Sequence, residues 1–449
     1  MPQLPPDFQF GVATSSYQIE GGVTEGGRGR SVWDDFCDRS GVIADGSNGD
    51  VACDSYHRFG EDIELMSGLD VDAYRFSIAW PRVLPDGTGS VNQAGLDYYD
   101  RLVDALCAKG IQPAATLFHW DLPSALEVDG GWLQRDTAEA FADYARIVIA
   151  RLGDRVSQWM TLNEPNVFTS LGYSTGIHAP GRTLGLYALP VAHHLMLGHG
   201  LAVSALRAGG ARSVGLAGNH TVVWPRSDSE ADRGAAELFD TMWNRIYTDP
   251  ILLGRYPEGI AAVMPGPVDI DLSVISAPID FYGVNYYNPT CVGIPGNGSN
   301  IGANVASDLP FDHYPITGYP VTDFGWPVVP QGLTDVLTML KERYGDRLPP
   351  VYITENGACY NDGPDANGVV ADTGRIDYYN SHIRAVADAI DLGVDVRGYF
   401  AWSLLDNFEW AEGYSKRFGL VHVDFDTLVR TPKQSYAWYA DLIARTKQA

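Results

Sequence analysis

The chain has 449 residues, of which 45% are hydrophobic and 19% are charged, a composition that provides enough apolar side chains for a large core. Its formal net charge of −25 predicts a surface that repels nucleic acid and anionic membranes, so we expect neither as a partner. The five cysteines are scattered and show no CxxC spacing, which argues against a disulfide framework and indicates a reducing compartment.

The N-terminal residues MPQLPPDFQFG contain neither the basic segment nor the apolar segment of a signal peptide. No apolar run reaches the roughly 18 residues needed to cross a membrane. Together with the cysteine pattern, these observations predict a cytoplasmic protein without a membrane anchor. The sequence leaves the oligomeric state open.

Eight short runs rich in apolar, β-branched and aromatic residues follow one another along the chain, and each is predicted to form a strand. They cover residues 8–14, 72–80, 112–120, 156–164, 213–220, 279–287, 350–356 and 397–403. Between them, apolar residues at helical spacing predict helices over residues 92–110, 136–153 and 374–393, each ending in glycine. Asp136 is the candidate N-cap of the second of these helices.

Eight alternating strand and helix units predict a single α/β domain over residues 1–449, a (β/α)8 barrel with long loops after the strands. No Gly/Ser or Pro run joins two parts of different composition. The loosest stretch, residues 292–304, is predicted to be a surface loop within the domain. The alternative is an open doubly wound sheet, which normally carries a glycine-rich phosphate turn after its first strand. Neither GxGxxG there nor GxxxxGKS/T anywhere is present.

In a (β/α)8 barrel the chemistry lies at the carboxyl ends of the strands. The polar residues at or near these ends are His119, Asn163, Glu164, Asn285, Tyr287 and Glu355. Polar residues that merely mark the end of a strand would explain one or two of these, but they explain the set poorly. We therefore expect a pocket at the barrel mouth.

Two carboxyl groups stand out in this set. Glu164 ends the fourth predicted strand and Glu355 the seventh, so a closed barrel would place them across its mouth from each other. Two convergent carboxyl groups are the minimum equipment for cleaving a glycosidic bond, because one protonates the leaving oxygen and the other meets the oxocarbenium-like carbon. The alternative is that each carboxylate caps a turn and forms an ion pair.

The neighbouring residues suggest how the two roles are divided. Arg75, late in the second predicted strand, would hold a nearby carboxylate ionised, and Tyr287 would donate a hydrogen bond to the same group. These two residues would support Glu355 as the nucleophile. Glu164 is then the acid/base, with a pKa raised partly by the negative charge of Glu355. Asn163 would orient a sugar hydroxyl beside it.

Several motifs resemble those of the family 1 glycoside hydrolases, the retaining β-glucosidases with a (β/α)8 barrel. They are FQFGVATSSYQIEGG (8–22), YRFSIAWPRVLPDG (74–87), TLFHWDLP (116–123), TLNEP (161–165), GVNYY (283–287), ITENG (353–357) and AWSLLDNFEWAEGYSKRFGL (401–420). The resemblance extends over nearly the whole chain. It implies that Glu164, in TLNEP, is the acid/base and that Glu355, in ITENG, is the nucleophile.

The resemblance also implies a sugar site made of amides, carboxyls and aromatic rings. Its predicted members are Gln18, His119, Asn163, Asn285, Tyr287, Trp402, Glu409, Trp410, Phe418 and Trp326. The first three would bind ring hydroxyls, and Trp402 would stack under the apolar face of the sugar. Glu409 and Trp410 would reach the far hydroxyls, while Trp326 would line the entrance.

The side of the leaving group offers further candidates, for each of which simple packing is an equal alternative: Val167, Phe168, Tyr173, His178, Asn219 and His220. No cofactor and no metal is expected. The three histidines of AHHLMLGHG (192–200) lack the spacing and the glutamate of a zinc site, so a helix with buried imidazoles is predicted there.

The substrate is expected to be unphosphorylated. Relatives that cleave 6-phosphoglycosides carry a serine at the position of Glu409, and a lysine and a tyrosine at those of Lys416 and Phe418. This chain shares only the lysine. We expect hydrolysis of terminal β-D-glucosyl residues from β-glucosides and cello-oligosaccharides, with β-galactosidase and β-fucosidase side activities.

Three other activities are alternatives for this barrel. A transglycosidase would differ only in whether an alcohol or water takes the glycosyl group. A non-catalytic sugar-binding protein would be expected to lack one of the two glutamates, and both are present. A Schiff-base enzyme needs a lysine at a strand end, and none stands there.

Overall fold

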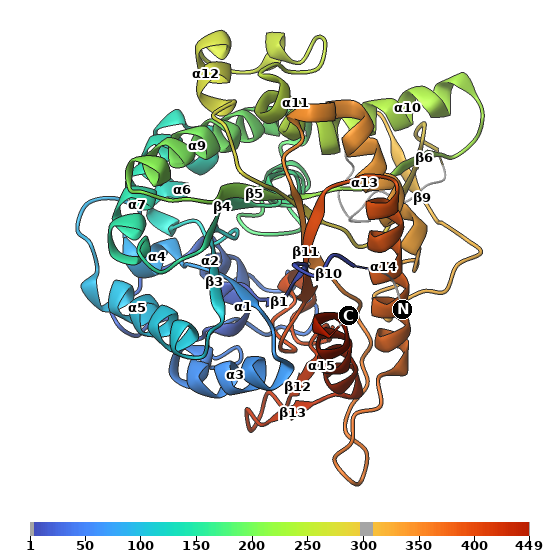
Figure 1. The fold of residues 1–449 in the computed structure, drawn as a ribbon. Helices are drawn as coiled ribbons and strands as arrows, with labels where there is room; N and C mark the ends of the chain where they lie inside the picture. Colours follow the sequence, from blue (N-terminus) through green and yellow to red (C-terminus); the bar gives the residue numbers. More distant parts are fainter. Residues whose placement is uncertain (1–3, 297–308, 449) are drawn as a thin grey trace.

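The computed structural model describes residues 4–296 and 309–448. Eight parallel strands close into a barrel in the order β1-β11-β10-β7-β5-β4-β3-β2 (Figure 1). They are β1 (Gln9–Ala13), β2 (Ala73–Ser77), β3 (Gln112–Phe118), β4 (Gln158–Asn163), β5 (Val214–Asn219), β7 (Tyr282–Asn285), β10 (Val351–Asn356) and β11 (Val396–Trp402). Each strand falls within a predicted run, except that β11 begins one residue earlier. The predicted (β/α)8 barrel is confirmed.

Helices cover the outside of the barrel and alternate with the strands along the chain (Figure 1). The longer ones are α3 (Ser55–Leu69), α5 (Gln93–Ala108), α7 (Arg135–Leu152), α9 (Leu189–Ala208), α10 (Glu230–Asp240), α11 (Ile246–Leu253), α12 (Val268–Ile275), α13 (Pro330–Tyr344), α14 (Thr373–Asp391) and α15 (Gln434–Lys447). Because these helices cover the parallel strands, the strands are buried on both faces, which explains their nearly continuous apolar sequences.

Shorter elements build the loops. The short α-helices are α1 (Ser16–Ile19), α2 (Val32–Cys37), α4 (Trp80–Val83), α6 (Ser124–Val128) and α8 (Pro165–Val167). The π-helical turns are η2 (Phe168–Ser174) and η4 (Thr241–Arg245). The 3-10 turns are η1 (Gly131–Leu133), η3 (Gly185–Ala188), η5 (Ala261–Val263), η6 (Gly345–Arg347) and η7 (Trp410–Glu412).

The three predicted helices are present as α5, α7 and α14. Their ends can be compared with the predicted terminal glycines and the predicted N-cap. Gly110 and Gly393, just beyond α5 and α14, have φ values of 74° and 85°, the left-handed conformation that commonly ends a helix. Asp136 is not an N-cap, because α7 begins at Arg135. Asp136 lies in the first turn instead, where its negative charge interacts favourably with the positive end of the helix dipole.

Helix α9 contains the predicted histidines, and all three imidazoles are buried. His193 bonds to Tyr256 at 2.8 Å, and His199 bonds to Thr161 at 2.7 Å. In the described part of the chain, the segment Gly185–Ala208 has the length and apolar composition of a membrane-crossing helix, which corrects the prediction that no run is long enough. Of its most apolar window, 78% is buried inside the structure, as in a core helix.

A small sheet lies outside the barrel and is made of β6 (Val223–Pro225), β8 (Thr290–Gly293) and β9 (Asp312–Tyr314). It corrects the start of the loop predicted over residues 292–304, because Val292 and Gly293 pair with β9. Residues 297–304 lie outside the described residues. A second pair of short strands, β12 (Val421–Val423) and β13 (Arg430–Pro432), precedes α15.

Candidate active site

A cavity of about 480 Å³ lies at the carboxyl ends of the barrel strands. Nine predicted site residues line it, namely Glu164, Glu355, His119, Tyr287, Trp402, Glu409, Trp410, Phe418 and Trp326. The other four predicted residues do not line the cavity but bond to residues that do: Arg75, Gln18, Asn163 and Asn285. The structure therefore brings the predicted set together at the barrel mouth.

The regular pairing of β4 and of β10 is interrupted close to the two glutamates, Glu164 just after β4 and Glu355 within β10. The register of β4 with β5 shifts between Met160 and Asn163, and the register of β10 with β7 shifts between Ile353 and Glu355. Such irregularities re-aim side chains at the rim of a barrel. Glu164 also has a φ of 45°, a left-handed conformation that is uncommon outside glycine and typical of functional sites.

The carboxyl group of Glu355 is bonded through both oxygens. Its Oε1 accepts from Nη1 of Arg75 at 2.5 Å, and its Oε2 accepts from the hydroxyl of Tyr287 at 2.8 Å. Arg75 is buried and also donates to the carbonyl of Thr354 at 3.1 Å. A fixed guanidinium and a phenol both favour the ionised form of the carboxyl. These are the two contacts that the sequence predicted for Glu355.

The carboxyl group of Glu164 is held by two amides instead. Its Oε1 accepts from Nδ2 of Asn285 at 2.8 Å and from Nδ2 of Asn219 at 3.0 Å. Each amide is oriented by a further donor, since Thr354 donates to Oδ1 of Asn285 at 2.6 Å and the indole of Trp243 donates to Oδ1 of Asn219 at 3.3 Å. Glu164 is therefore fixed in position by neutral groups.

Asn163 links the two carboxyl groups. Its Oδ1 accepts from Nη2 of Arg75 at 2.6 Å and from Nδ2 of Asn285 at 3.0 Å. A continuous chain of hydrogen bonds thus runs from Glu355 through Arg75, Asn163 and Asn285 to Glu164. The amide that was predicted to bind a sugar hydroxyl also sets the geometry between the two carboxyl groups.

The surroundings give the two carboxyl groups different proton affinities. Burial raises the pKa of Glu164 to about 8, and the negative charge of Glu355 contributes to the increase. Burial also raises the pKa of Glu355, but Arg75 and Tyr287 oppose this effect. Arg75 therefore limits the rise in the pKa of Glu355. Because the guanidinium is bonded to Glu355, this carboxyl loses its proton first and Glu164 keeps its own.

A third carboxyl group, that of Glu409, also lines the cavity. Burial, together with the charges of Glu355 and Glu164, raises its pKa to about 8. The amide of Gln18 reaches it at 3.5 Å and also donates to the carbonyl of Phe408 at 2.9 Å. A protonated Glu409 both donates and accepts hydrogen bonds, which suits the hydroxyl groups of a sugar.

His119 is a neutral member of this site, because burial lowers its pKa well below the usual value. Its Nε2 accepts from Nδ2 of Asn163 at 3.1 Å, so the proton of the imidazole stands on Nδ1. Among the described residues, this Nδ1 has no hydrogen-bond partner although it is buried.

Aromatic rings form another part of the cavity wall. The ring of His119 is stacked with those of Trp402 and Trp410, with both centroid distances 5.9 Å. Trp410 packs in turn between Trp120 and Trp33, at 4.7 and 4.5 Å. Packed rings of this kind keep their orientation and offer a flat apolar surface, which matches the C–H face of a pyranose.

Trp326, predicted to line the entrance, is among the residues that line the cavity. It stacks with Phe324 at 4.1 Å and contacts Tyr287 at 5.4 Å. Phe418 closes this aromatic group, 6.0 Å from Trp326. No carboxylate among the described residues lies within hydrogen-bond distance of Lys416, which donates to the carbonyl of Asp323 at 3.0 Å and lies over the ring of Phe324.

The candidates for the leaving-group side divide into two sets. Val167, His178 and Asn219 line the cavity. Phe168, Tyr173 and His220 do not, because they are engaged in packing and hydrogen bonds elsewhere. Phe168 packs on Phe118, Tyr173 donates to Glu127 at 2.5 Å, and both ring nitrogens of His220 are bonded.

Several residues of the cavity wall were missed from the sequence: Trp120, Leu171, Ile177, Thr221, Phe239, Trp243, Asn288, Thr290, Phe324, Ala411 and Glu412. Trp120 ends a predicted strand beside His119, so its position was a usable signal. Phe239 and Trp243 come from α10 and η4, which lie outside the barrel units. Nothing in their local sequence indicates that these segments fold back over the mouth.

Glu355, which is bonded to a guanidinium, and Glu164, which keeps its proton, line the same cavity. Such a pair can act as a nucleophile and a general acid. On an eight-stranded barrel, such a mouth defines a (β/α)8 glycoside hydrolase. In the described residues, no group of three or more His, Cys, Asp or Glu side chains is arranged to hold a metal ion.

The chain belongs to glycosyl hydrolase family 1, whose sequence profile it matches over residues 1–448. It is 48% identical to a β-glucosidase of Agrobacterium sp. over 98% of this chain and 95% of that protein. It is 45% identical to β-glucosidase A of Acetivibrio thermocellus over 98% of each chain. Its fold matches that of a family 1 β-glucosidase from Thermotoga maritima, with a TM-score of 0.93, 43% identity and 99% of each chain covered.

Proposed function

We propose that this chain is a retaining exo-β-glucosidase that releases terminal non-reducing β-D-glucosyl residues from β-glucosides and cello-oligosaccharides. The observation that carries the proposal is the difference between the two buried carboxyl groups, since Glu355 is bonded to Arg75 and Glu164 to amides. The β-glucosidases among the similar proteins support it. So does the Thermotoga maritima β-glucosidase, for which a complex with glucoimidazole is known.

In the proposed first step, a carboxylate oxygen of Glu355 attacks the anomeric carbon while Glu164 gives its proton to the leaving oxygen. The glycosidic bond breaks, and an ester forms between the sugar and Glu355. In the second step, Glu164 takes a proton from water, and the water oxygen attacks the same carbon and releases Glu355. Two displacements return the sugar with its original configuration.

The direct test is an NMR time course of p-nitrophenyl β-D-glucoside hydrolysis. We expect the anomeric proton of β-glucose to appear first, with α-glucose following at the rate of mutarotation, because two inversions restore the β configuration. Initial release of α-glucose would refute the covalent step and the role of Glu355. Absence of any hydrolysis would refute the proposed enzyme.

The pH dependence of kcat/KM is expected to follow the two carboxyl groups. Glu164 must be protonated and Glu355 ionised in the free enzyme. Because the pKa of Glu164 is about 8, kcat/KM for cellobiose should hold to about pH 8 and then fall roughly tenfold per pH unit. On the acid side it should fall as Glu355 becomes protonated.

Initial rates between pH 4 and 10 would measure this profile, with enzyme returned to pH 7 as the control for irreversible inactivation. A reversible profile that stays flat to pH 9.5 would contradict the protonated state assigned to Glu164. In the variant Glu164→Gln, the remaining activity should lose its alkaline limb, because the titrating group is gone.

The sugar is proposed to be unphosphorylated glucose. Glu409 and Phe418 offer no cation to a 6-phosphate, and the amine of Lys416 is bonded to a backbone carbonyl. A buried carboxyl with a pKa of about 8 can share hydrogen bonds with both the 4- and 6-hydroxyl groups. A 44% identical enzyme of Bifidobacterium breve is a bifunctional β-D-glucosidase/β-D-fucosidase, which supports a β-fucosidase side activity here, and we propose a β-galactosidase one as well.

We further propose that residues 1–449 form one catalytic domain that acts in the cytoplasm without a cofactor. Its partners are small β-glucosides and short oligosaccharides, including those released in cellulose degradation. The scattered cysteines and the charge of −25 support this setting. All five cysteines are free thiols in the structure.

A further inference from the structure

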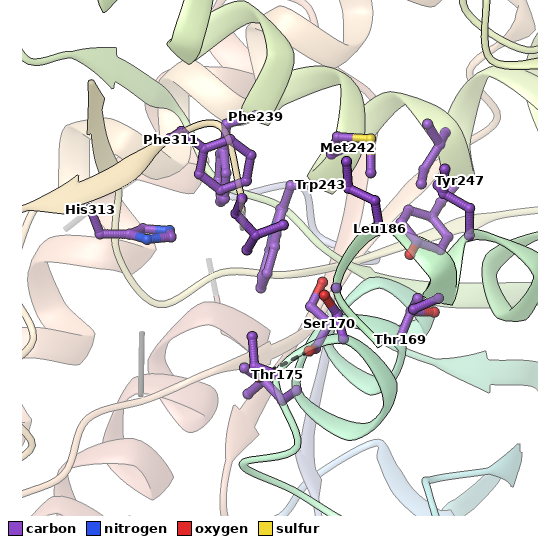
Figure 2. Close-up of a pocket in the computed structure, with 17 residues that line it drawn as sticks. Thr169, Ser170, Thr175, Leu186, Phe239, Met242, Trp243, Tyr247, Phe311 and His313 are labelled. Atoms are coloured by element: carbon purple, nitrogen blue, oxygen red, sulfur yellow. Dashed lines mark hydrogen bonds between the residues drawn. The ribbon is translucent and has the colours of Figure 1, made fainter. Parts of the chain in front are cut away.

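The wall of the catalytic cavity has two parts that are supported differently. One part, which includes Phe239 and Trp243, is shared with a second cavity of about 80 Å³ (Figure 2). Another part is supplied by the segment that follows β11, residues 403–420, here called the β11 loop, which carries Glu409 and Trp410. The first part borders a further open space, whereas the β11 loop is held by a group of buried charged side chains.

Asp406 lies at the centre of this charged group. Its Oδ1 accepts from Nζ of Lys433 at 2.7 Å and from the backbone N–H of Gly419 at 2.9 Å. Its Oδ2 accepts from Nη1 of Arg417 at 2.9 Å. The side chains of Asp406 and Lys433 are both 0% exposed. Although burial favours the neutral acid, Lys433 and Arg417 lower the pKa of Asp406 below its usual value, so the carboxyl is ionised.

These bonds close the base of the β11 loop. Asp406 stands near the start of the loop, and Arg417 and Gly419 stand at its end, so one carboxylate joins the two limbs. The limbs also approach closely, because a Cβ atom on Gly419 would lie 2.1 Å from the backbone nitrogen of Asp406. Glu409 and Trp410 lie between the joined limbs and are therefore presented to the cavity from a closed base.

The carboxylate fixes the geometry of this base more than it stabilises the fold. The attraction between buried charges is largely offset by the loss of their hydration, and apolar side chains of similar volume often stabilise a core as well. Three directional bonds to one charged group define how the two limbs lie relative to each other. Glu409 depends on this placement, because among the described residues its carboxyl has a single hydrogen-bond partner, the amide of Gln18 at 3.5 Å.

We propose that Asp406 is a positioning residue for sugar recognition, which places Glu409 for the 6-hydroxyl group of the glucosyl residue by closing the base of the β11 loop. This inference rests on the proposed β-glucosidase function. Asp406 does not line the catalytic cavity and acts through Glu409. Its loss should therefore weaken the hydrolysis of sugars that have a 6-hydroxyl group far more than the hydrolysis of sugars that lack one.

The test compares p-nitrophenyl β-D-glucoside with its 6-deoxy analogue, and the measured quantity is the ratio of the two kcat/KM values. In Asp406→Asn, the amide keeps the shape of the side chain but removes the charge and turns an NH2 group toward one of the donors. We expect the ratio to fall at least about fivefold, because a displacement of about 1 Å in a positioning group can cost up to about 10²-fold.

The ratio separates positioning from a merely structural role. Partial loss of folded enzyme would lower both kcat/KM values by the same factor and leave the ratio unchanged. The rates are measured at about pH 6.5, where the amine of Lys433 is charged, since burial lowers its pKa only to about 8.

A second variant and a matched control support the comparison. Arg417→Met removes the partner of Oδ2 and leaves Lys433 and Gly419 in place, at a side chain that is 21% exposed. It should lower the ratio at least about twofold. In the control, Asp271→Asn removes the charge of another buried carboxylate, which is bonded to Arg135 at 2.6 and 2.7 Å and does not line the catalytic cavity. It should lower the melting temperature and keep the native ratio.

Glu409→Ala shows whether Asp406 acts through Glu409. Alone, this variant should lower the ratio, because Glu409 is proposed to bind the 6-hydroxyl group. Adding Asp406→Asn should then change the ratio by less than about twofold, because the group that Asp406 places is already missing. A full additional fall in the double variant would overturn the proposal, and so would a native ratio in Glu409→Ala.

The failure of this inference is distinguishable from the failure of the proposed function. If the native enzyme hydrolyses the glucoside but Asp406→Asn and Arg417→Met keep the native ratio, the positioning role is refuted and the proposed function stands. An equal fall in Asp271→Asn also refutes the positioning role. If Asp406→Asn does not fold, Arg417→Met decides by the same criterion. If the native enzyme hydrolyses no β-glucoside, the proposed function is refuted, and the positioning role with it.

Discussion

Glu355→Gln is expected to abolish the turnover of β-glucosides, lowering kcat by at least about 10⁴-fold. The amide keeps the size of the side chain, and its single oxygen can still accept from Arg75 while its NH2 group faces the hydroxyl of Tyr287, but it cannot form the ester with the sugar. The measurement is kcat with p-nitrophenyl β-D-glucoside. Glu342→Gln, on the exposed surface of α13, is the matched control and should behave like the native enzyme.

A second variant at this position gives a signature that loss of folding cannot imitate. In Glu355→Gly, azide can occupy the space of the missing carboxylate and attack the anomeric carbon directly. A single displacement inverts the configuration, so the expected product is α-glucosyl azide. Near-normal rates in Glu355→Gln, or β-glucosyl azide from Glu355→Gly, would contradict the assignment of the nucleophile.

Glu164→Ala is expected to have a large effect that depends on the leaving group. For alkyl glucosides, kcat/KM should fall about 10²- to 10⁴-fold, because the departing alkoxide needs a proton. For 2,4-dinitrophenyl β-D-glucoside, the fall in kcat/KM should be much smaller, since this phenolate leaves without protonation. Rates with both substrates, measured on the same preparation, separate lost acid catalysis from lost folding.

Azide also tests the role of Glu164 in the second step, the hydrolysis of the glycosyl-enzyme. In Glu164→Ala the glycosyl-enzyme still forms from the dinitrophenyl substrate, and water then attacks it slowly because the general base is missing. Azide needs no base and should accelerate turnover, giving β-glucosyl azide after the second inversion. A uniform loss with both substrates and no effect of azide would show that Glu164 is not the acid/base.

The fold was predictable because the barrel repeats one pattern. Each strand is buried on both faces, so its sequence is a short apolar run. The helices between the strands show apolar residues at helical spacing. Asp136 was misplaced because the residue type favoured at an N-cap is also favoured in the first turn. The sheet of β6, β8 and β9 was missed since its strands have only three or four residues each.

The candidate site was predictable where a residue stands at a strand end, as for Glu164, Glu355 and Asn285. Phe168 and Tyr173 follow Glu164 closely in sequence, but the π-helical turn η2 directs them into packing with neighbours. The high pKa of Glu409 comes from its burial and from the charges of Glu355 and Glu164, which are distant from it in sequence and close in space. No local pattern could have indicated this proximity.

The hydrogen-bonded chain between the two carboxyl groups has a consequence for the timing of the reaction. In the proposed mechanism, Glu355 gives up its negative charge when it becomes an ester. The charge that helps to keep Glu164 protonated then disappears, so the proton affinity of Glu164 falls after it has acted as an acid. The same side chain is thereby prepared to accept a proton from water. The barrel mouth thus alternates between two charge states, and each half of the cycle sets up the protonation that the other half requires.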